Sequence, residues 1–115
     1  MDNVKNDEYY IARIERDVDF IIQKTKDLSI DDFNGNEMLQ DSMMFRLIQI
    51  SESAGHITQN YKSNHPEIPW KDIYGLRNRI VHDYGNISLA LVFSTLKKDI
   101  PALKKAFGIP EKKFL

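Results

Sequence analysis

Apolar residues recur at steps of three and four along most of the chain, and this helical spacing constrains the fold more than any other feature. Four segments show it, with no β alternation of useful length and no internal repeat between them. Their apolar positions are Ile11, Ile14, Val18, Ile21 and Leu28; then Leu39, Met43, Met44, Leu47, Ile50, Ala54, Ile57 and Tyr61; then a shorter stretch over 70–82; and last Leu89, Val92, Phe93, Leu96, Ile100, Leu103 and Phe107. The sequence predicts an all-α fold, an antiparallel bundle of four main helices.

Local signals indicate where the first helices begin and end. Ser29 and Asp32 have the spacing of a capping box, which would open a short helical turn that Asn34-Gly35 ends. The second long helix is expected to run from about Glu37 to Tyr61. Gly55 falls inside it at a cost of roughly 1 kcal/mol relative to alanine, so we expect a neighbouring helix to approach closely there.

The second half carries its own boundary signals. Pro69 suits the first turn of the third helix, over about Trp70 to His82, and the turn residues 83–86 then break it. Ser88 is placed to cap the last helix. Pro101 should kink that helix, because proline removes a backbone donor and clashes with the preceding turn. Gly108 and Pro110 are expected to close it, before a basic tail over 111–115.

Length and composition limit the class of protein. With 115 residues the chain has the size of one ordinary domain, 1–115. It has no cysteine, which excludes disulfides, a thiol nucleophile and thiolate metal sites and fits a reducing cytoplasm. No apolar run is long enough for a signal sequence or a membrane span. We therefore expect a soluble, cytoplasmic protein with no membrane partner.

Charge is divided unevenly along the chain. Residues 1–60 carry six Lys/Arg and twelve Asp/Glu, whereas residues 61–115 carry ten and five. Such a split could hold two copies together or attract phosphate to one face, although solvated helix faces would give the same counts. The short third helix also predicts a bundle with one incomplete side, which a second copy would cover.

Two of the three histidines offer no chemistry. Neither His56 nor His65 has a partner at the spacing of a metal site, so no metal and no cofactor are predicted. His56 lies one turn beyond Glu52, which predicts a surface contact, and His65 precedes a proline in a loop, where we expect it to be exposed.

The third histidine lies in a chemically dense stretch, GLRNRIVHDYGNI. Arg77, Asn78, Arg79, His82 and Tyr84 fall within eight residues. RNA cleavage without a metal needs a base for the 2′-hydroxyl, an acid for the leaving 5′-oxygen and a cation on the phosphate. Imidazole can serve either proton-transfer role and guanidinium grips phosphate through paired donors. The residue types suffice for that reaction, but they also suit a helix C-terminus whose dipole attracts basic residues.

Helical geometry complicates this interpretation. At roughly 100° per residue, His82 shares a face with Asn78 and with Arg79, but it points about 140° away from Arg77. Three arrangements remain open: the helix unwinds before His82, the long arginine side chain wraps around, or the site is completed across a dimer. A dimer would also supply two histidines, one as base and one as acid.

Arg77, Asn78, His82 and Tyr84 together match the RxxxxHxY signature of the HEPN ribonucleases. The surrounding sequence resembles the HepT branch of that superfamily over almost the whole chain, in LQDSMMFRLIQISESAG, HPEIPWKDIYGLRNRIVHDY and LVFSTLKKDIPALKKAF. One departure is Asp83, where the family often has glycine. An acid there could orient His82 or compete for Arg77, which puts the rate in doubt.

The resemblance implies a dimeric four-to-five-helix HEPN bundle that acts as a toxin ribonuclease. Arg77 would stabilise the scissile phosphate, His82 would transfer the proton, and Asn78 and Arg79 would position or bind the substrate. The implied substrate is cellular RNA, with tRNA among the candidates, cut to a 2′,3′-cyclic phosphate and a 5′-hydroxyl. A nucleotidyltransferase antitoxin of the MntA type would attach AMP to Tyr84 and so silence the toxin.

Two alternatives and one further pair stay open at this point. The chain could be a non-catalytic helical partner of a nucleotidyltransferase, with the motif a relic or a modification target, or a bundle scaffold without chemistry. In the second helix, Arg46 and Glu52 could form a buried pair near the active site or simply mark the polar stripe.

Overall fold

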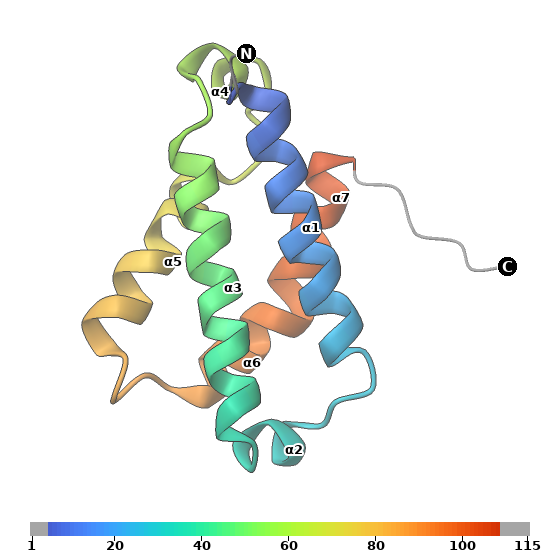
Figure 1. The fold of residues 1–115 in the computed structure, drawn as a ribbon, viewed down its shortest axis with the longest axis vertical. Coiled ribbons are helices and arrows are strands. Elements are labelled where there is room, and N and C mark those ends of the chain that lie inside the picture. The colour runs from blue at the N-terminus through green and yellow to red at the C-terminus, as the bar shows by residue number, and fades with distance from the viewer. Residues whose placement is uncertain (1–4, 109–115) are drawn as a thin grey trace, which may run out of the picture.

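Every regular element in the computed structural model, which describes residues 5–108, is helical (Figure 1). This confirms the predicted all-α class. None of the described helices is long and apolar enough to cross a membrane. The elements are, in order, α1 (Asp7–Thr25), α2 (Ile30–Asn34), α3 (Glu37–Gly55), α4 (Gln59–Asn64), α5 (Trp70–Asp83), α6 (Leu89–Ser94), a π-helical turn η1 (Thr95–Asp99) and α7 (Ile100–Phe107).

Helix α3 lies at the centre of the molecule and packs against α1 on one flank and α5 on the other (Figure 1). The stretch from α6 through α7 runs behind this layer, where η1 and α7 pack on α1. Buried apolar side chains from most of the helices meet between the two layers, as the spacing predicts. The fully buried members are Ile14, Val18, Ile21, Phe33, Met43, Ile50, Ala54 and Leu96.

Several predicted helix ends are confirmed by their hydrogen bonds. The backbone N–H of Asp32 donates to Ser29 Oγ at 3.0 Å, and the N–H of Ser29 donates to the Asp32 carboxylate at 3.4 Å, which completes the capping box. Ser88 Oγ accepts from Leu91 N at 3.3 Å and caps α6. Gly108 closes α7 in the left-handed conformation, with φ of 68°. Pro110 and the tail after it lie outside the described residues.

The second long helix is shorter than predicted: α3 ends at Gly55 and does not continue to Tyr61. A Cβ built on Gly55 would meet nothing within 4 Å, so the expected close approach of a neighbouring helix is wrong. The glycine instead ends the helix, and Thr58 caps the separate helix α4. Asp7 at the start of α1 accepts hydrogen bonds from the backbone N–H and the hydroxyl of Thr58, at 2.8 and 2.6 Å. These bonds stabilise the break, and chiefly the hydroxyl bond holds the pKa of Asp7 below its usual value.

Pro101 disturbs the last helix, as predicted, but the disturbance is a π-helical turn. Pro101 is the second residue of α7, and the five residues before α7 form η1. A proline ring would clash with the carbonyl of Lys97, four residues earlier, in a regular α-helix. The wider π turn accommodates the ring without ending the helical path.

The short helix α2 depends on one aromatic side chain. Phe33 is fully buried, and its ring lies 5.6 Å from that of Phe93 on α6. We expect Phe33→Ala to lower the free energy of unfolding by about 3–5 kcal/mol in a urea titration, because it leaves a cavity between α2 and α6. Met38→Ala is the control, since Met38 is 83% exposed and should change stability little. Equal midpoints for the two variants would contradict this packing account.

Candidate active site

The predicted catalytic residues lie on the last two turns of α5, the helix at the edge of the α1–α3–α5 layer in Figure 1. The prediction of a helix over 70–82 is confirmed to within one residue, since α5 ends at Asp83. The backbone N–H of Asn86 donates to Asp83 O at 2.7 Å and forms the turn that follows. Because α5 stays helical through His82, the first of the three open arrangements, unwinding before His82, is wrong.

Arg77 is held by an acidic residue of the neighbouring helix. Its Nε lies 2.5 Å from Glu52 Oε1 on α3, and both side chains are about half exposed, at 47% and 49%. The ion pair uses Nε and leaves the two terminal nitrogens of the guanidinium as donors. Glu52 therefore fixes the orientation of Arg77 without occupying the end of the fork that would grip a phosphate.

Tyr84, the C-terminal cap of α5, is anchored in a similar way. Its hydroxyl donates a hydrogen bond to Asp41 Oδ1, near the start of α3, and its side chain is 48% exposed. The bond to Asp41 is the main reason why the pKa of Tyr84 lies above the usual value for a phenol, with smaller contributions from burial and from the charges of Asp41 and Glu37. The hydroxyl is therefore protonated, ordered and within reach of solvent.

Asp41 and Glu52 form an acidic stripe on α3; from the sequence, Asp41 was not singled out and Glu52 was considered as a partner of Arg46 but not of Arg77. Eleven residues apart, they lie about 20° apart around the helix, and Arg77 and Tyr84, seven apart, do the same on α5. The acidic stripe of α3 thus faces Arg77 and Tyr84 of α5, and each acid contacts one of them. The spacings are visible in the sequence, but nothing in it says which stripe faces which helix.

Asn78 and His82 lie on the other side of α5. Both are exposed, and neither makes a side-chain hydrogen bond or ion pair with any other residue in the range 5–108. They are about 40° apart around the helix, and His82 is about 140° from Arg77. Asp83 is also exposed and forms no ion pair with the residues described, so the acid that competes for Arg77 is Glu52.

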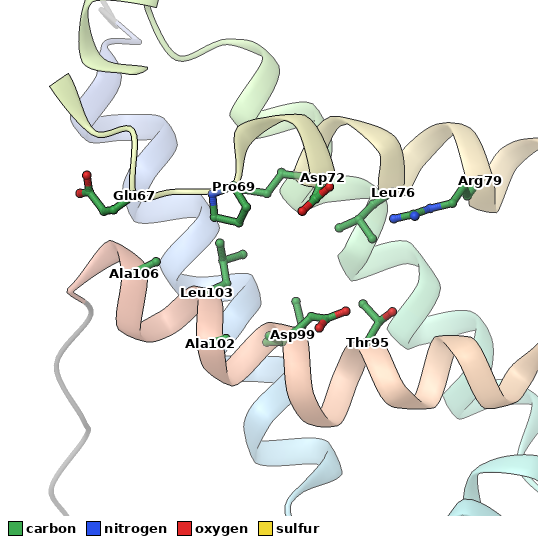
Figure 2. Close-up of a pocket in the computed structure, with 12 residues that line it drawn as sticks. Glu67, Pro69, Asp72, Leu76, Arg79, Thr95, Asp99, Ala102, Leu103 and Ala106 are labelled. Atoms are coloured by element: carbon green, nitrogen blue, oxygen red, sulfur yellow. The ribbon is translucent and has the colours of Figure 1, made fainter. Parts of the chain in front are cut away.

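Arg79 lies in a groove between α5 and the η1–α7 stretch. The groove encloses about 530 Å³, and its lining includes Leu76, Arg79, Thr95 and Asp99. Figure 2 shows Leu76 and Arg79 on the α5 side, with Thr95 and Asp99 opposite. Arg79 is roughly 160° from Arg77 around the helix, so the two arginines do not converge on one phosphate within a single chain.

The possible pair between Arg46 and Glu52 does not form. Arg46 Nη1 instead lies 2.8 Å from Asp17 Oδ1 on α1, and its guanidinium carbon is 3.8 Å from the centre of the Phe20 ring. Six residues on one helix are about 120° apart, which directs Arg46 to α1 and Glu52 to α5. Arg46 links α3 to α1, whereas Glu52 belongs to the candidate site.

The other two histidines make ring contacts. His56 caps α3 and stacks on Tyr10 with ring centres 4.7 Å apart. His65 is half-buried, because it stacks on Tyr61 at 4.0 Å and its Nδ1 lies 2.9 Å from Tyr61 O, so the predicted exposure of His65 is wrong. In the described part of the chain, no three His, Asp or Glu side chains are grouped so that they could hold a metal ion.

Comparison with known proteins identifies the family of this chain. A family model described as ribonuclease HepT-like matches residues 2–107. The "Probable ribonuclease HepT" of Thermococcus cleftensis is 30% identical over 98 residues, which cover 85% of this chain and 89% of the relative. No solved structure gives a significant match.

Two further relatives are also named as RNases. "Putative RNase MJ1380" of Methanocaldococcus jannaschii is 33% identical over 89 residues, covering 77% of this chain and 82% of its own. "Putative RNase TTE0752" of Caldanaerobacter subterraneus subsp. tengcongensis is 28% identical over 102 residues, covering 89% and 91%. Because the family model spans nearly the whole helical bundle and includes the Arg77–Tyr84 stretch, the chain belongs to the HepT-like ribonuclease family.

Proposed function

We propose that this protein is the toxin of a cytoplasmic toxin–antitoxin pair of the type VII class, and that it cuts cellular RNA, with tRNA as a candidate target, without a metal ion. Membership of a ribonuclease family supports the substrate class. The observation that carries the proposal is the exposed stretch of α5 on which Glu52 orients the Arg77 guanidinium while His82 stays free of side-chain partners among the residues described.

The proposed reaction uses only groups of this protein. One imidazole takes the proton of the RNA 2′-hydroxyl, and the 2′-oxygen attacks the neighbouring phosphorus. The bond from phosphorus to the 5′-oxygen breaks, and a second imidazole, in its protonated form, gives a proton to that oxygen. The products are a 2′,3′-cyclic phosphate and a 5′-hydroxyl. Arg77 binds the phosphate through its terminal nitrogens as charge builds, and Asn78 positions the phosphate or His82.

The active form in this proposal is a homodimer. Arg77 and His82 point about 140° apart on one rigid helix, so one copy cannot direct both at the same phosphate unless the arginine leaves Glu52 and wraps around the helix. Between them on α5, Tyr74 and Val81 are 38% and 50% exposed and form an apolar ridge. A second copy packed on this ridge would bring Arg77 of one chain toward His82 of the other and would supply both histidines.

Silencing by AMP follows from the position of Tyr84. In the proposed modification, the Tyr84 oxygen attacks the α-phosphorus of ATP, pyrophosphate leaves, and Asp41 accepts the phenolic proton through the hydrogen bond it already receives. The modified oxygen can no longer donate to Asp41, whose negative charge repels the new phosphate. Arg77 lies on the same edge of α5 and attracts it. A bulky anion on Arg77 would exclude RNA.

The nuclease proposal predicts a large loss of activity in two single variants. Arg77→Ala and His82→Ala should each slow cleavage of RNA in EDTA by about 10²-fold or more, because each removes a group that acts on the reacting atoms. Gel analysis of labelled RNA with the purified proteins, together with growth of a bacterial host that expresses them, measures this effect. Lys71→Ala is the matched control, an exposed cation on the same helix that should cut as wild type does.

The same experiment tests the alternative of a non-catalytic partner. If wild type cuts no RNA in EDTA and the host grows equally with wild type and His82→Ala, the nuclease proposal fails. If Tyr84 still accepts AMP under those conditions, the protein is a binding partner and modification target of a nucleotidyltransferase.

The silencing proposal predicts that neutralisation of the ribonuclease depends on the Tyr84 hydroxyl. Incubated with ATP and an MntA-type nucleotidyltransferase, wild type should gain the mass of at least one AMP and stop cutting RNA. Tyr84→Phe should keep cutting and escape modification, because it lacks the attacking oxygen. Tyr74→Phe, which changes another exposed tyrosine of α5, serves as the control and should behave as wild type. Full neutralisation of Tyr84→Phe, seen by mass spectrometry and cleavage assay, would refute this assignment.

A further inference from the structure

A cationic hollow lies on the α1 side of α3, beside the candidate active site. It encloses about 260 Å³ between α1 and α3. Its lining consists of Arg13, Arg16 and Asp17 of α1 and Phe45, Arg46 and Gln49 of α3. Three guanidinium groups thus meet one carboxylate, in a half of the chain where acidic residues outnumber basic residues by two to one.

The only acidic residue among those that line the hollow, Asp17, already forms an ion pair. Asp17 is nearly buried, with its side chain 8% exposed, and forms the 2.8 Å ion pair with Arg46. Stacking of Arg46 on Phe20 further fixes this pair as part of the packing between α1 and α3. The charges that remain at the mouth of the hollow are therefore those of Arg13 and Arg16.

These two arginines have no acidic partner in the described part of the chain. Arg13 donates from Nη2 to Gln49 Oε1 at 3.1 Å and from Nη1 to Tyr9 Oη at 3.3 Å. Both partners are neutral, so they orient the guanidinium without cancelling its charge. Arg16 is exposed beside it. Neither side chain belongs to the buried core, so packing alone does not account for placing two like charges together.

An aromatic ring completes the hollow. Phe45 is 56% exposed, although it is apolar and borders the arginines. Proteins that bind single-stranded RNA combine cations that follow the phosphate backbone with exposed aromatic rings on which bases stack. The combination in this hollow is of that kind.

The hollow and the candidate active site share one surface. Gln49 and Glu52 are one turn apart on α3, about 60° around the helix, and they contact Arg13 on one flank and Arg77 on the other. Helices α1, α3 and α5 lie side by side in Figure 1. A strand that crosses α3 would travel about 10 Å, the diameter of a helix, which a few nucleotides of single-stranded RNA can span.

We propose that this hollow is a second RNA-binding subsite, in which Arg13 and Arg16 hold a backbone phosphate a few nucleotides from the scissile one and a neighbouring base stacks on Phe45. The inference rests on the proposed ribonuclease function and adds to it a determinant of substrate length. RNA that spans both sites gains affinity from the hollow, and RNA that reaches only the scissile phosphate does not.

The test uses the double variant Arg13→Ala/Arg16→Ala in two assays. For a single-stranded RNA of about 10 nucleotides, binding by fluorescence anisotropy should weaken about tenfold, as expected for lost charge-assisted hydrogen bonds. The salt dependence of binding should also become shallower, since fewer phosphates are neutralised. In cleavage assays KM for this RNA should rise while kcat stays the same, and cleavage of a dinucleotide should be unchanged.

Two controls separate the hollow from general charge and stability. Lys98→Ala/Lys105→Ala removes the same number of exposed cations from η1 and α7 and should leave RNA binding nearly unchanged. Phe45→Ala should weaken binding of the longer RNA, whereas Met38→Ala, an exposed apolar residue of the same helix, should not. Thermal unfolding of each variant confirms that the fold is retained.

The outcomes distinguish this inference from the proposed function. If wild type cuts RNA and the double arginine variant matches the lysine control in both assays, the subsite is refuted and the nuclease stands. If wild type cuts nothing, the nuclease proposal fails, and anisotropy alone then decides whether the hollow binds RNA. A double variant that loses its dimeric mass in light scattering, with no separate effect on RNA, would assign the hollow to contact between copies and overturn the subsite.

Discussion

The side chains of α5 point in directions that the helix itself imposes, because the helix stays regular through Asp83. At roughly 100° per residue, Arg77 and His82 diverge by about 140°. Arg77 turns toward α3, where Glu52 holds it, and His82 turns toward solvent. The cation and the proton-transfer group of the proposed reaction are therefore only five residues apart in sequence, but they point in different directions. A second copy is the simplest way to unite them, and this need links the proposed chemistry to the proposed assembly.

The acidic stripe of α3 contacts both the proposed phosphate-binding group, Arg77, and the proposed modification target, Tyr84. Glu52 orients Arg77 and Asp41 anchors the Tyr84 hydroxyl. A negative group attached to Tyr84 would lose Asp41 as a partner and would find the Arg77 guanidinium nearby. In the proposed scheme, the scissile phosphate of RNA and the phosphate attached to Tyr84 therefore compete for the charge of Arg77. The α1 side of α3 borders the cationic hollow, where Gln49 of α3 accepts a hydrogen bond from Arg13 of α1, so a single helix contacts every site proposed for this protein.

Sequence periodicity predicted the helices and the core, because burial of an apolar stripe requires spacing that can be counted. The periodicity did not predict features that depend on tertiary contacts. The Asp7–Thr58 hydrogen bonds stabilise a helix break at a place where the apolar pattern continues. Stacking on Tyr61 half-buries His65, which was expected to be exposed. The sequence predicted Arg77, Asn78, Arg79, His82 and Tyr84 as site residues, and the structure places all five on α5 or at its C-terminal cap. Asp41 was not predicted as a partner of the site, and Glu52 was considered as a partner of Arg46 but not of Arg77. Pairing between two helices depends on their rotation and register, and the spacing of residues along one helix does not give these.

Mixed dimers test the central claim most directly. Wild-type and His82→Ala chains with different affinity tags are co-expressed, purified through both tags and assayed for RNA cleavage in EDTA beside the two homodimers. If one cleavage event uses the imidazoles of both copies, the mixed dimer lacks one of them and should cut RNA almost as slowly as the His82→Ala homodimer. A mixed particle of dimeric mass that keeps about half of the wild-type activity, as two independent sites would, contradicts the account, as does a wild-type enzyme that cuts RNA as a monomer.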